Sequence, residues 1–393
     1  MAPWRRYPKV GPRALGALLL GGLLGWGGSS PAGAQSIWIT PSFRLSEDFD
    51  SNINLTTKAT SDFVTSATPG LAIEFRDYPF TLSLYGHLIS QFYASHSELN
   101  TYTDNIDLGG NLVYQPIPTL TLSLSDGYVR NVNPSVVAPE SGVTTGRAAS
   151  TGNTVSAALS YQFERLTTAQ LSYSLTTLRS EAAAAQDSDS QSVSAGILRE
   201  LTPTVSSGLK YIYNHFHVSD QPDLDSHSPR VSLVVRYTPT ITLSSNTGPI
   251  WLQQTDGSYE LTYASSTRYD QKFSRGSISL AYSRDAGTGG FTGVPSVNNS
   301  VTGTAGYELT RYLTASANAS WFKTSSTGNN GGGSLDLQTY TAGAGLTYRL
   351  LKWLTLNASY TFYRQIGSGT GVTDVDRHVF SLGLTASDQF RVY

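Results

Sequence analysis

Residues 339–364 (TYTAGAGLTYRLLKWLTLNASYTFYR) show the feature that most limits how this chain can fold. Apolar side chains alternate with polar or small ones along both halves of the segment, with a break at residues 350–352. A period of two is the signature of a β-strand. Aromatic residues mark the ends of the apolar faces, as at Tyr340, Tyr348 and Phe362. Because membrane-crossing strands end in this way at their water interfaces, the segment predicts a hairpin with one lipid-facing and one water-facing side.

The same hairpin recurs along the chain. A Tyr, five residues, then Leu-Thr is found at residues 114–121, 307–314 and 348–355. We expect a first strand over residues 37–49 and a last one over 378–392. The eight hairpins between them have turns centred on residues 76–79, 116–118, 164–165, 202–203, 238–239, 269–274, 310–311 and 350–352. This gives 18 strands, or 16 without the hairpin at residues 269–274, and even numbers are the rule in bacterial outer-membrane barrels.

The composition favours a membrane barrel over soluble domains. Only 14% of the 393 residues are charged, whereas Tyr (23) and Gly (37) are abundant. After the first 30 residues no apolar run reaches the roughly 18 residues of a transmembrane helix. A closed barrel is the other fold that pairs every backbone group in lipid. The sequence therefore predicts an all-β, transmembrane, antiparallel up-and-down β-barrel, with short periplasmic turns alternating with longer polar extracellular loops.

The N-terminus has the pattern of a signal peptide. Basic residues precede an apolar stretch over residues 14–26, and Ala32-Gly33-Ala34 is a typical cleavage site. We expect a signal peptide over residues 1–34 and an outer-membrane barrel over residues 35–393, in the outer membrane of a Gram-negative bacterium. Cleavage would leave 22 of the 26 Lys and Arg against 28 Asp and Glu, a net charge of −6, so no nucleic-acid partner is expected.

No motif predicts catalysis, a cofactor or a metal. The sequence has no cysteine, which excludes disulfides and thiolate metal sites. His215 and His217, with Asp223, Asp225 and His227 nearby, do not have a fixed metal-ligand spacing. There is no G-x-S-x-G motif, and the glycine clusters at residues 287–290 and 328–333 lack the lysine of a phosphate loop.

The remaining candidates are side chains that line the lumen. Charges are costly on the lipid face near the midplane, so charged residues within strands are expected to face the water inside. Aromatic residues on the same face would offer stacking surfaces to sugar rings. The candidate lumen-lining residues are Trp38, Arg44, Glu74, Lys210, Arg236, Phe322, Tyr363 and Arg364, with Arg230, Glu308, Lys323 and Arg349 as further charged positions.

The first two expected strands resemble a known family. Residues 44–52 (RLSEDFDSN), 61–65 (SDFVT) and 69–71 (PGL) resemble the opening of the β-barrel porin type 2 proteins, and the repeated Tyr and Leu-Thr hairpins resemble the rest of them. Members of that family are outer-membrane barrels often associated with exopolysaccharide export. The resemblance implies such a role here, together with periplasmic and inner-membrane export machinery as partners. It implies no catalytic residue.

Three functions follow as hypotheses. The first is a porin that gives an exopolysaccharide a passive path across the outer membrane. The alternative is a general diffusion porin for small solutes, and the third is a lipid-acting or structural barrel. An export conduit should have an aromatic-lined lumen, whereas a diffusion porin should have loops folded into a constriction with opposed acidic and basic clusters. Lipid and the outer-membrane assembly machinery are expected partners in each case.

Overall fold

A computed structural model describes residues 36–138, 146–182, 185–219, 221–253, 257–287, 290–292, 296–326, 336–368 and 374–392. The predicted signal peptide lies outside these residues. The described strands are β1 (Ser36–Asp50), β2 (Asp62–Asp77), β3 (Phe80–Tyr93), β4 (Thr101–Ile117), β5 (Leu120–Asn131), β6 (Ser150–Glu164), β7 (Thr167–Ser180), β8 (Ser188–Thr202), β9 (Val205–Val218), β10 (Leu224–Thr238), β11 (Ile241–Gln253), β12 (Tyr259–Phe273), β13 (Gly276–Gly287), β14 (Ser296–Glu308), β15 (Leu313–Ser326), β16 (Asp336–Arg349), β17 (Leu354–Ser368), β18 (Val375–Ser387) and β19 (Phe390–Arg391).

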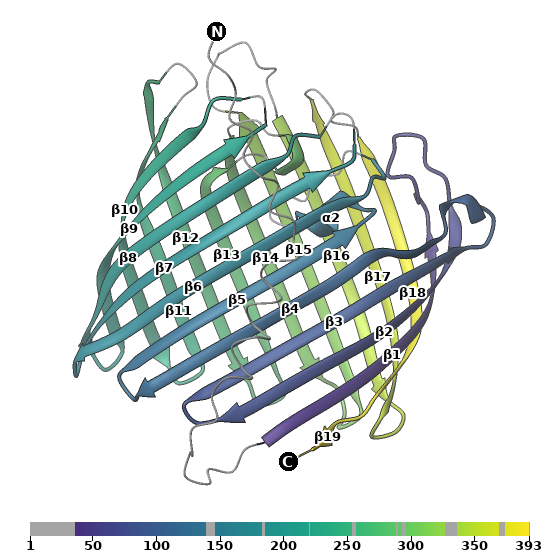
Figure 1. The fold of residues 1–393 in the computed structure, drawn as a ribbon, viewed down its shortest axis with the longest axis horizontal. Helices are drawn as coiled ribbons and strands as arrows, with labels where there is room; N and C mark the ends of the chain where they lie inside the picture. Colours follow the sequence, from purple (N-terminus) through teal and green to yellow (C-terminus); the bar gives the residue numbers. More distant parts are fainter. Residues whose placement is uncertain are drawn as a thin grey trace, which may run out of the picture. The chain divides into compact units, whose positions relative to one another are not determined.

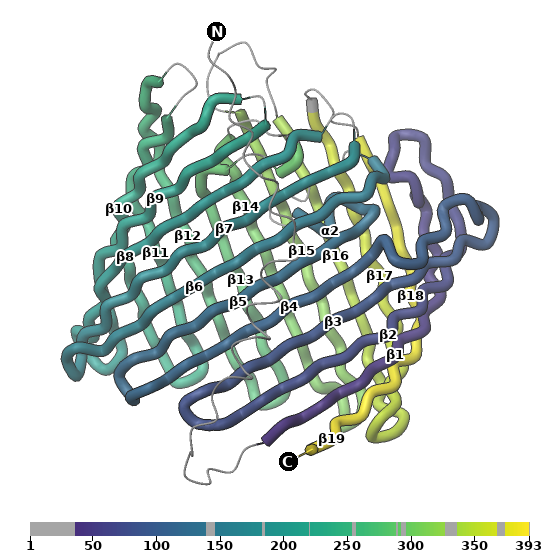
Figure 2. Tube along the Cα trace, viewed as in Figure 1, coloured from purple at the N-terminus to yellow at the C-terminus, as the bar shows by residue number. Residues whose placement is uncertain are grey.

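The strands form one closed barrel. Each strand from β1 to β17 pairs antiparallel with the next, and β18 pairs back onto β1 from Ser42 opposite Ser387 to Asp50 opposite Val379. Figure 2 shows the first strand of the chain beside the last ones at this closure. The short β19 follows β18 in the chain and pairs with Trp38 and Ile39 of β1, in the same register as β18. The ladder is interrupted beside Pro41, which has no N–H to donate.

The sequence prediction of an 18-stranded up-and-down barrel is confirmed. The hairpin that separated 18 strands from 16 is formed by β12 and β13, which pair from Ser265 opposite Arg284 to Phe273 opposite Gly276. All eight expected turns are present at one end of the barrel, and longer connections occupy the other end (Figure 1). We call these the turn end and the loop end.

The outer face is apolar and the inner face polar. Side chains alternate between the two faces along each strand, and directly paired residues of neighbouring strands point to the same face. One exposed apolar residue therefore assigns the other residues of its strand, and their partners, to the outer or the inner face. In β1 the exposed residues Phe43 and Leu45 define the outer phase. Exposed aromatics gather near the turns, as at Tyr78, Tyr237 and Trp353, and again towards the loops, as at Phe63, Tyr259 and Tyr340, with aliphatic residues between.

This outer surface is suited to lipid and not to water. A strand of 14 residues tilted by about 40° rises roughly 35 Å, enough to cross an apolar band of about 25 Å. Within the described residues no helix is long and apolar enough to cross a membrane. The helical pieces are η1 (Ser97–Leu99), α2 (Pro134–Val137) and η2 (Gly290–Thr292), all in loop-end connections. Asn133 caps α2 by accepting a hydrogen bond from the N–H of Ser135, with Pro134 in the first turn.

Gly208 in β9 gives a test of the packing of the wall. A Cβ atom there would lie 2.0 Å from the carbonyl oxygen of Ile197 on β8, whereas a Cβ at Gly306 in β14 would meet nothing within 4 Å. We expect Gly208→Ala to destabilise the folded barrel by about 1–3 kcal/mol because backbone atoms must shift. The urea dependence of the folded fraction, read from electrophoretic mobility without boiling, measures this. Gly306→Ala is the matched control, and equal urea midpoints for the two variants would contradict the pairing of β8 with β9 in this register.

Candidate functional site: the barrel lumen

Seven of the eight candidate lumen-lining residues lie on the inner face. Trp38 and Arg44 alternate with outward-facing Phe43 and Leu45 on β1, and the same phase places the others. The inner-face candidates are Trp38, Arg44, Glu74, Lys210, Arg236, Phe322 and Tyr363, and Arg230, Glu308 and Arg349 share this face.

The placement of Arg364 in the lumen is wrong. Arg364 has the phase of the exposed Ile366 and is opposite Tyr340, so it lies on the outer face at the loop end of β17. Its Nε is 3.8 Å from Oδ1 of Asp376, a residue at the same end of β18. Lys323 is also outward, with its Nζ 3.4 Å from Oδ1 of Asp336. Near a strand end an outward cation reaches water and lipid headgroups, so charge alone does not fix the face.

The inner aromatics do not form a continuous track. Trp38 lies at the turn end of β1, while Phe322 and Tyr363 lie at the loop end of β15 and β17. Tyr363 is only 9% exposed, and its hydroxyl donates to Oε1 of the buried Gln365 at 2.9 Å. Small polar side chains occupy the inner face of β17 below Tyr363, namely Thr355, Asn357, Ser359 and Thr361. This part of the wall therefore offers hydroxyl and amide groups, not rings.

Two opposed walls carry charge of opposite sign. Five strands from β18 through β4 face the five strands β9–β13 across the ring, with β5–β8 and β14–β17 between them. The first wall has five carboxylates and three cations on its inner face, and the second has five cations and three carboxylates. Their members are Asp48, Asp50, Asp62, Glu74, Asp107, Arg44, Arg76 and Arg377 on the acidic wall, and Lys210, Arg230, Arg236, Arg268, Lys272, Glu260, Asp270 and Asp285 on the basic wall. A transverse electric field across the lumen follows from this arrangement.

Arg230 holds part of the basic wall in place. Its side chain is 3% exposed, and its Nη2 donates to Oδ2 of Asp285 at 2.6 Å. Asp285 is three strands away on β13, so the guanidinium group crosses the inner faces of β11 and β12. The side chain can cross because the residues beneath it are small. Gly248 on β11 and Ala264 on β12 are paired with each other at this place. A Cβ on Gly248 would lie 2.9 Å from Cα of Arg230.

A connection from the far side of the ring crosses the lumen near the loop end. Phe291, between β13 and β14, is fully buried against Val137 of α2 and Leu178 of β7. Its carbonyl oxygen accepts a hydrogen bond from the N–H of Gln186 at 2.8 Å. The inner face of β6 supports the same cluster, since a Cβ at Gly152 would be 2.8 Å from Cγ1 of Val137.

The reach of this crossing is short. Phe291 is four residues beyond Gly287, the end of β13, and four residues extend at most about 14 Å. Since β13 and β7 are six places apart in the ring, the barrel must be narrow here. We call the cluster of Val137, Leu178 and Phe291 the lumen strap. It forms a constriction inside the loop end of the barrel.

The histidine and aspartate motif lies on the outer face and not in the lumen. His215 and His217 share the outward phase of Tyr211 and Tyr213 on β9. Nδ1 of His217 is 2.6 Å from Oδ1 of Asp223. Across the described residues, no group of three or more histidine, aspartate or glutamate side chains is arranged to hold a metal ion.

Three inner residues on β3 and β4 were missed by sequence reasoning. Tyr85, His87 and Asp107 face the lumen near mid-height, and Nδ1 of His87 is 3.9 Å from Oδ2 of Asp107. A Cβ on Gly109 would lie 2.4 Å from the Tyr85 ring, which shows how that ring lies along the wall. Apolar residues on both faces of β3, such as Leu84 and Ile89, obscured its phase.

Comparisons with known proteins find only distant likeness. No protein-family model matches the chain, and no curated protein matches its sequence. Among solved structures, OpdQ of Pseudomonas aeruginosa is 11% identical with a TM-score of 0.42, covering 91% of this chain and 98% of that one. OccAB4 of Acinetobacter baumannii is 14% identical with a TM-score of 0.45, covering 91% of this chain and 99% of that one. The outer membrane protein OpdK of P. aeruginosa is 11% identical with a TM-score of 0.45, covering 90% and 99%. At these values no family is assigned.

Loss of Phe291 is expected to open the lumen strap. Phe291→Ala removes a fully buried ring, which costs about 3–5 kcal/mol of local packing, while the β-ladder stays intact. We expect a larger single-channel conductance in planar bilayers with no change in gel mobility. Val136→Ala, at an exposed position of α2, is the control. Equal conductance of both variants and the unmodified channel would show that the strap does not constrict the lumen.

Proposed function

We propose that this protein is an outer-membrane porin that lets small polar and charged solutes diffuse passively. The observation that carries the proposal is the pair of oppositely charged walls that face each other across the lumen. A polarised, water-lined passage orders small dipolar solutes and ions without binding them tightly. An 18-stranded barrel is wide enough for an aqueous channel.

The same features favour diffusion over polysaccharide export. A sugar chain moving through the barrel would benefit from closely spaced rings along its path. The inner rings are instead isolated from one another, with Trp38 at the turn end, Tyr85 near mid-height and Phe322 at the loop end, and Tyr363 is buried. The resemblance to the β-barrel porin type 2 proteins remains the support for exopolysaccharide export, and that function is the competing outcome of the tests below.

We place the turn end in the periplasm and the loop end outside the cell. Short periplasmic turns and longer external loops are the rule for bacterial outer-membrane barrels. The predicted signal peptide would deliver the chain to the periplasm, where the assembly machinery would receive it.

The charged walls give a direct test of conduction through the lumen. Lys210→Glu combined with Arg268→Glu reverses two charges of the basic wall. We expect the reversal potential in a salt gradient to shift towards cation selectivity, because the local concentration of cations rises. Arg364→Glu, on the outer face, is the matched control and should leave the potential unchanged. A shift in the control but not in the double variant would reject the assigned lumen.

Transport by cells distinguishes the two proposed cargoes. Deletion of the gene should slow uptake of small charged solutes and leave the surface polysaccharide unchanged. Loss of surface polysaccharide with unchanged solute uptake would reject the diffusion porin in favour of export.

A further inference from the structure

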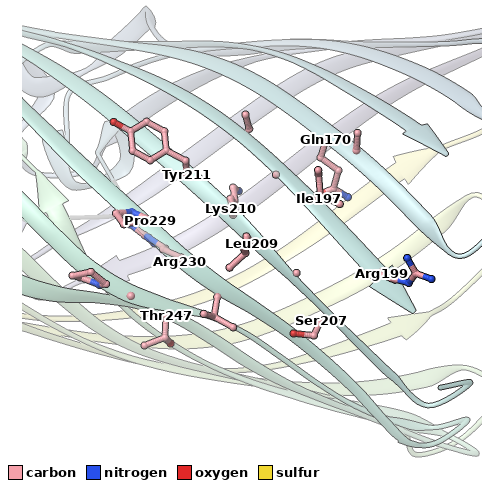
Figure 3. A pocket seen from close by; sticks show the side chains of 17 residues that line it. Gln170, Ile197, Arg199, Ser207, Leu209, Lys210, Tyr211, Pro229, Arg230 and Thr247 are labelled. Atoms are coloured by element: carbon pink, nitrogen blue, oxygen red, sulfur yellow. The ribbon is translucent and has the colours of Figure 1, made fainter. Parts of the chain in front are cut away.

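An apolar groove runs along the outer face of β7–β11. Its volume is about 840 Å³, within the range of ligand-binding pockets (Figure 3). Outward-facing Ile197, Leu209 and Val231 form its sides, and Leu209 is 70% exposed. Ala195 and Pro229 widen it, since neither projects far from the wall. A groove of this kind in a membrane wall fits a hydrocarbon chain.

The groove exists because the wall bends sharply at this place. In Figure 1, β8, β9 and β10 form the edge where the wall turns from the front to the back of the barrel. The inside of a tight bend has no room for side chains, and Cβ atoms on the inner-phase Gly208 and Gly248 would each lie 2.0 Å from a carbonyl oxygen of the neighbouring strand. On the outside of the same bend, side chains are spread apart, which leaves the space between Ile197, Leu209 and Val231.

The turn end of the groove is charged. Arg199 lines it, and among the described strands Arg199 is the one cation that faces outward in the turn-end half of the barrel. Arg199 is four residues before Pro203 in the turn, roughly 10 Å along the barrel axis. From this depth a long arginine side chain can extend towards the turn end and reach the headgroup interface.

An acidic residue, Glu164, stands beside Arg199 without a hydrogen bond to it. Nη1 of Arg199 is 3.9 Å from Oε2 of Glu164, too far for a hydrogen bond, and both side chains are 60% exposed. Thr167 lies between them, opposite both residues in the ladders of β6–β7 and β7–β8, and its hydroxyl donates to Oε2 of Glu164 at 3.2 Å. A cationic and an anionic group are therefore held side by side, and each keeps capacity for a further partner.

We infer that this groove binds one ethanolamine glycerophospholipid of the periplasmic leaflet. The phosphate accepts hydrogen bonds from Arg199, the ammonium group donates to Glu164, and an acyl chain follows Ile197, Leu209 and Val231 towards the midplane. A phosphate and an ammonium group in one headgroup match the paired charges, whereas a purely anionic headgroup would be repelled by Glu164. The inference rests on the membrane orientation of the proposed function, but not on conduction.

Native mass spectrometry of the full folded barrel tests this inference. The protein is released from detergent with phosphatidylethanolamine or phosphatidylglycerol of the same acyl chains, and retained lipids are counted. We expect one preferentially retained phosphatidylethanolamine. Arg199→Gln should weaken its retention about tenfold, the worth of a charge-assisted hydrogen bond. Glu164→Gln should abolish the preference for ethanolamine over glycerol.

Two further variants separate binding from general effects. Ala195→Phe fills the groove and should lower retention of both lipids, while Arg364→Gln, an outward arginine at the opposite end, should leave retention unchanged. Gel mobility without boiling confirms that each variant is folded. Equal retention in the unmodified protein, Arg199→Gln and Ala195→Phe would overturn the inference, as would preferential retention of lipopolysaccharide over phosphatidylethanolamine. Lipid retention is scored apart from conductance, so this inference and the porin function can fail independently.

Discussion

The pairing of β1 with β18 is the interaction on which the rest of the structure depends. In lipid, an unpaired backbone N–H or C=O group costs several kcal/mol, and an open sheet would expose a whole row of them at each edge. Closure from Ser42–Ser387 to Asp50–Val379 removes both edges. Near the turn end Pro41 interrupts the ladder, and β19 restores pairing beyond it. Arg377 strengthens the same seam at the loop end, with its Nη2 2.6 Å from Oδ2 of the buried Asp50.

Closure also fixes which side chains meet water. Since pairing keeps one phase around the ring, each strand contributes one row to lipid and one to the lumen. Charge is then sorted by wall, acidic from β18 to β4 and basic from β9 to β13, and the lumen strap narrows the passage near the loop end. The outer face in turn acquires a groove where the wall bends, with Arg199 and Glu164 at its turn end. One backbone constraint thus generates both surfaces that we propose to be functional.

Much of this barrel could be predicted from the sequence because its strands and turns are specified by residues close together in the chain. The alternation, the repeated hairpin and the turn positions predicted 18 strands and the correct face for seven of eight candidates. Arg364 failed because charge was given more weight than the phase of Phe362, two residues before it. The lumen strap and the Arg230–Asp285 pair could not be predicted, since they join segments far apart in sequence. The groove depends on the curvature of the wall, and no short sequence pattern predicts that curvature.

A single-cysteine scan of β17 tests the central claim most directly, and the absence of native cysteine makes it simple. A membrane-impermeant thiol reagent is added to channels reconstituted in a bilayer while current is recorded. The alternation predicts that cysteines replacing Thr355, Asn357, Ser359 and Thr361 react and change the current, whereas those replacing Leu356, Ala358 and Tyr360 do not. Reaction at the second set, or equal reaction at both sets, would contradict a closed barrel with this lumen.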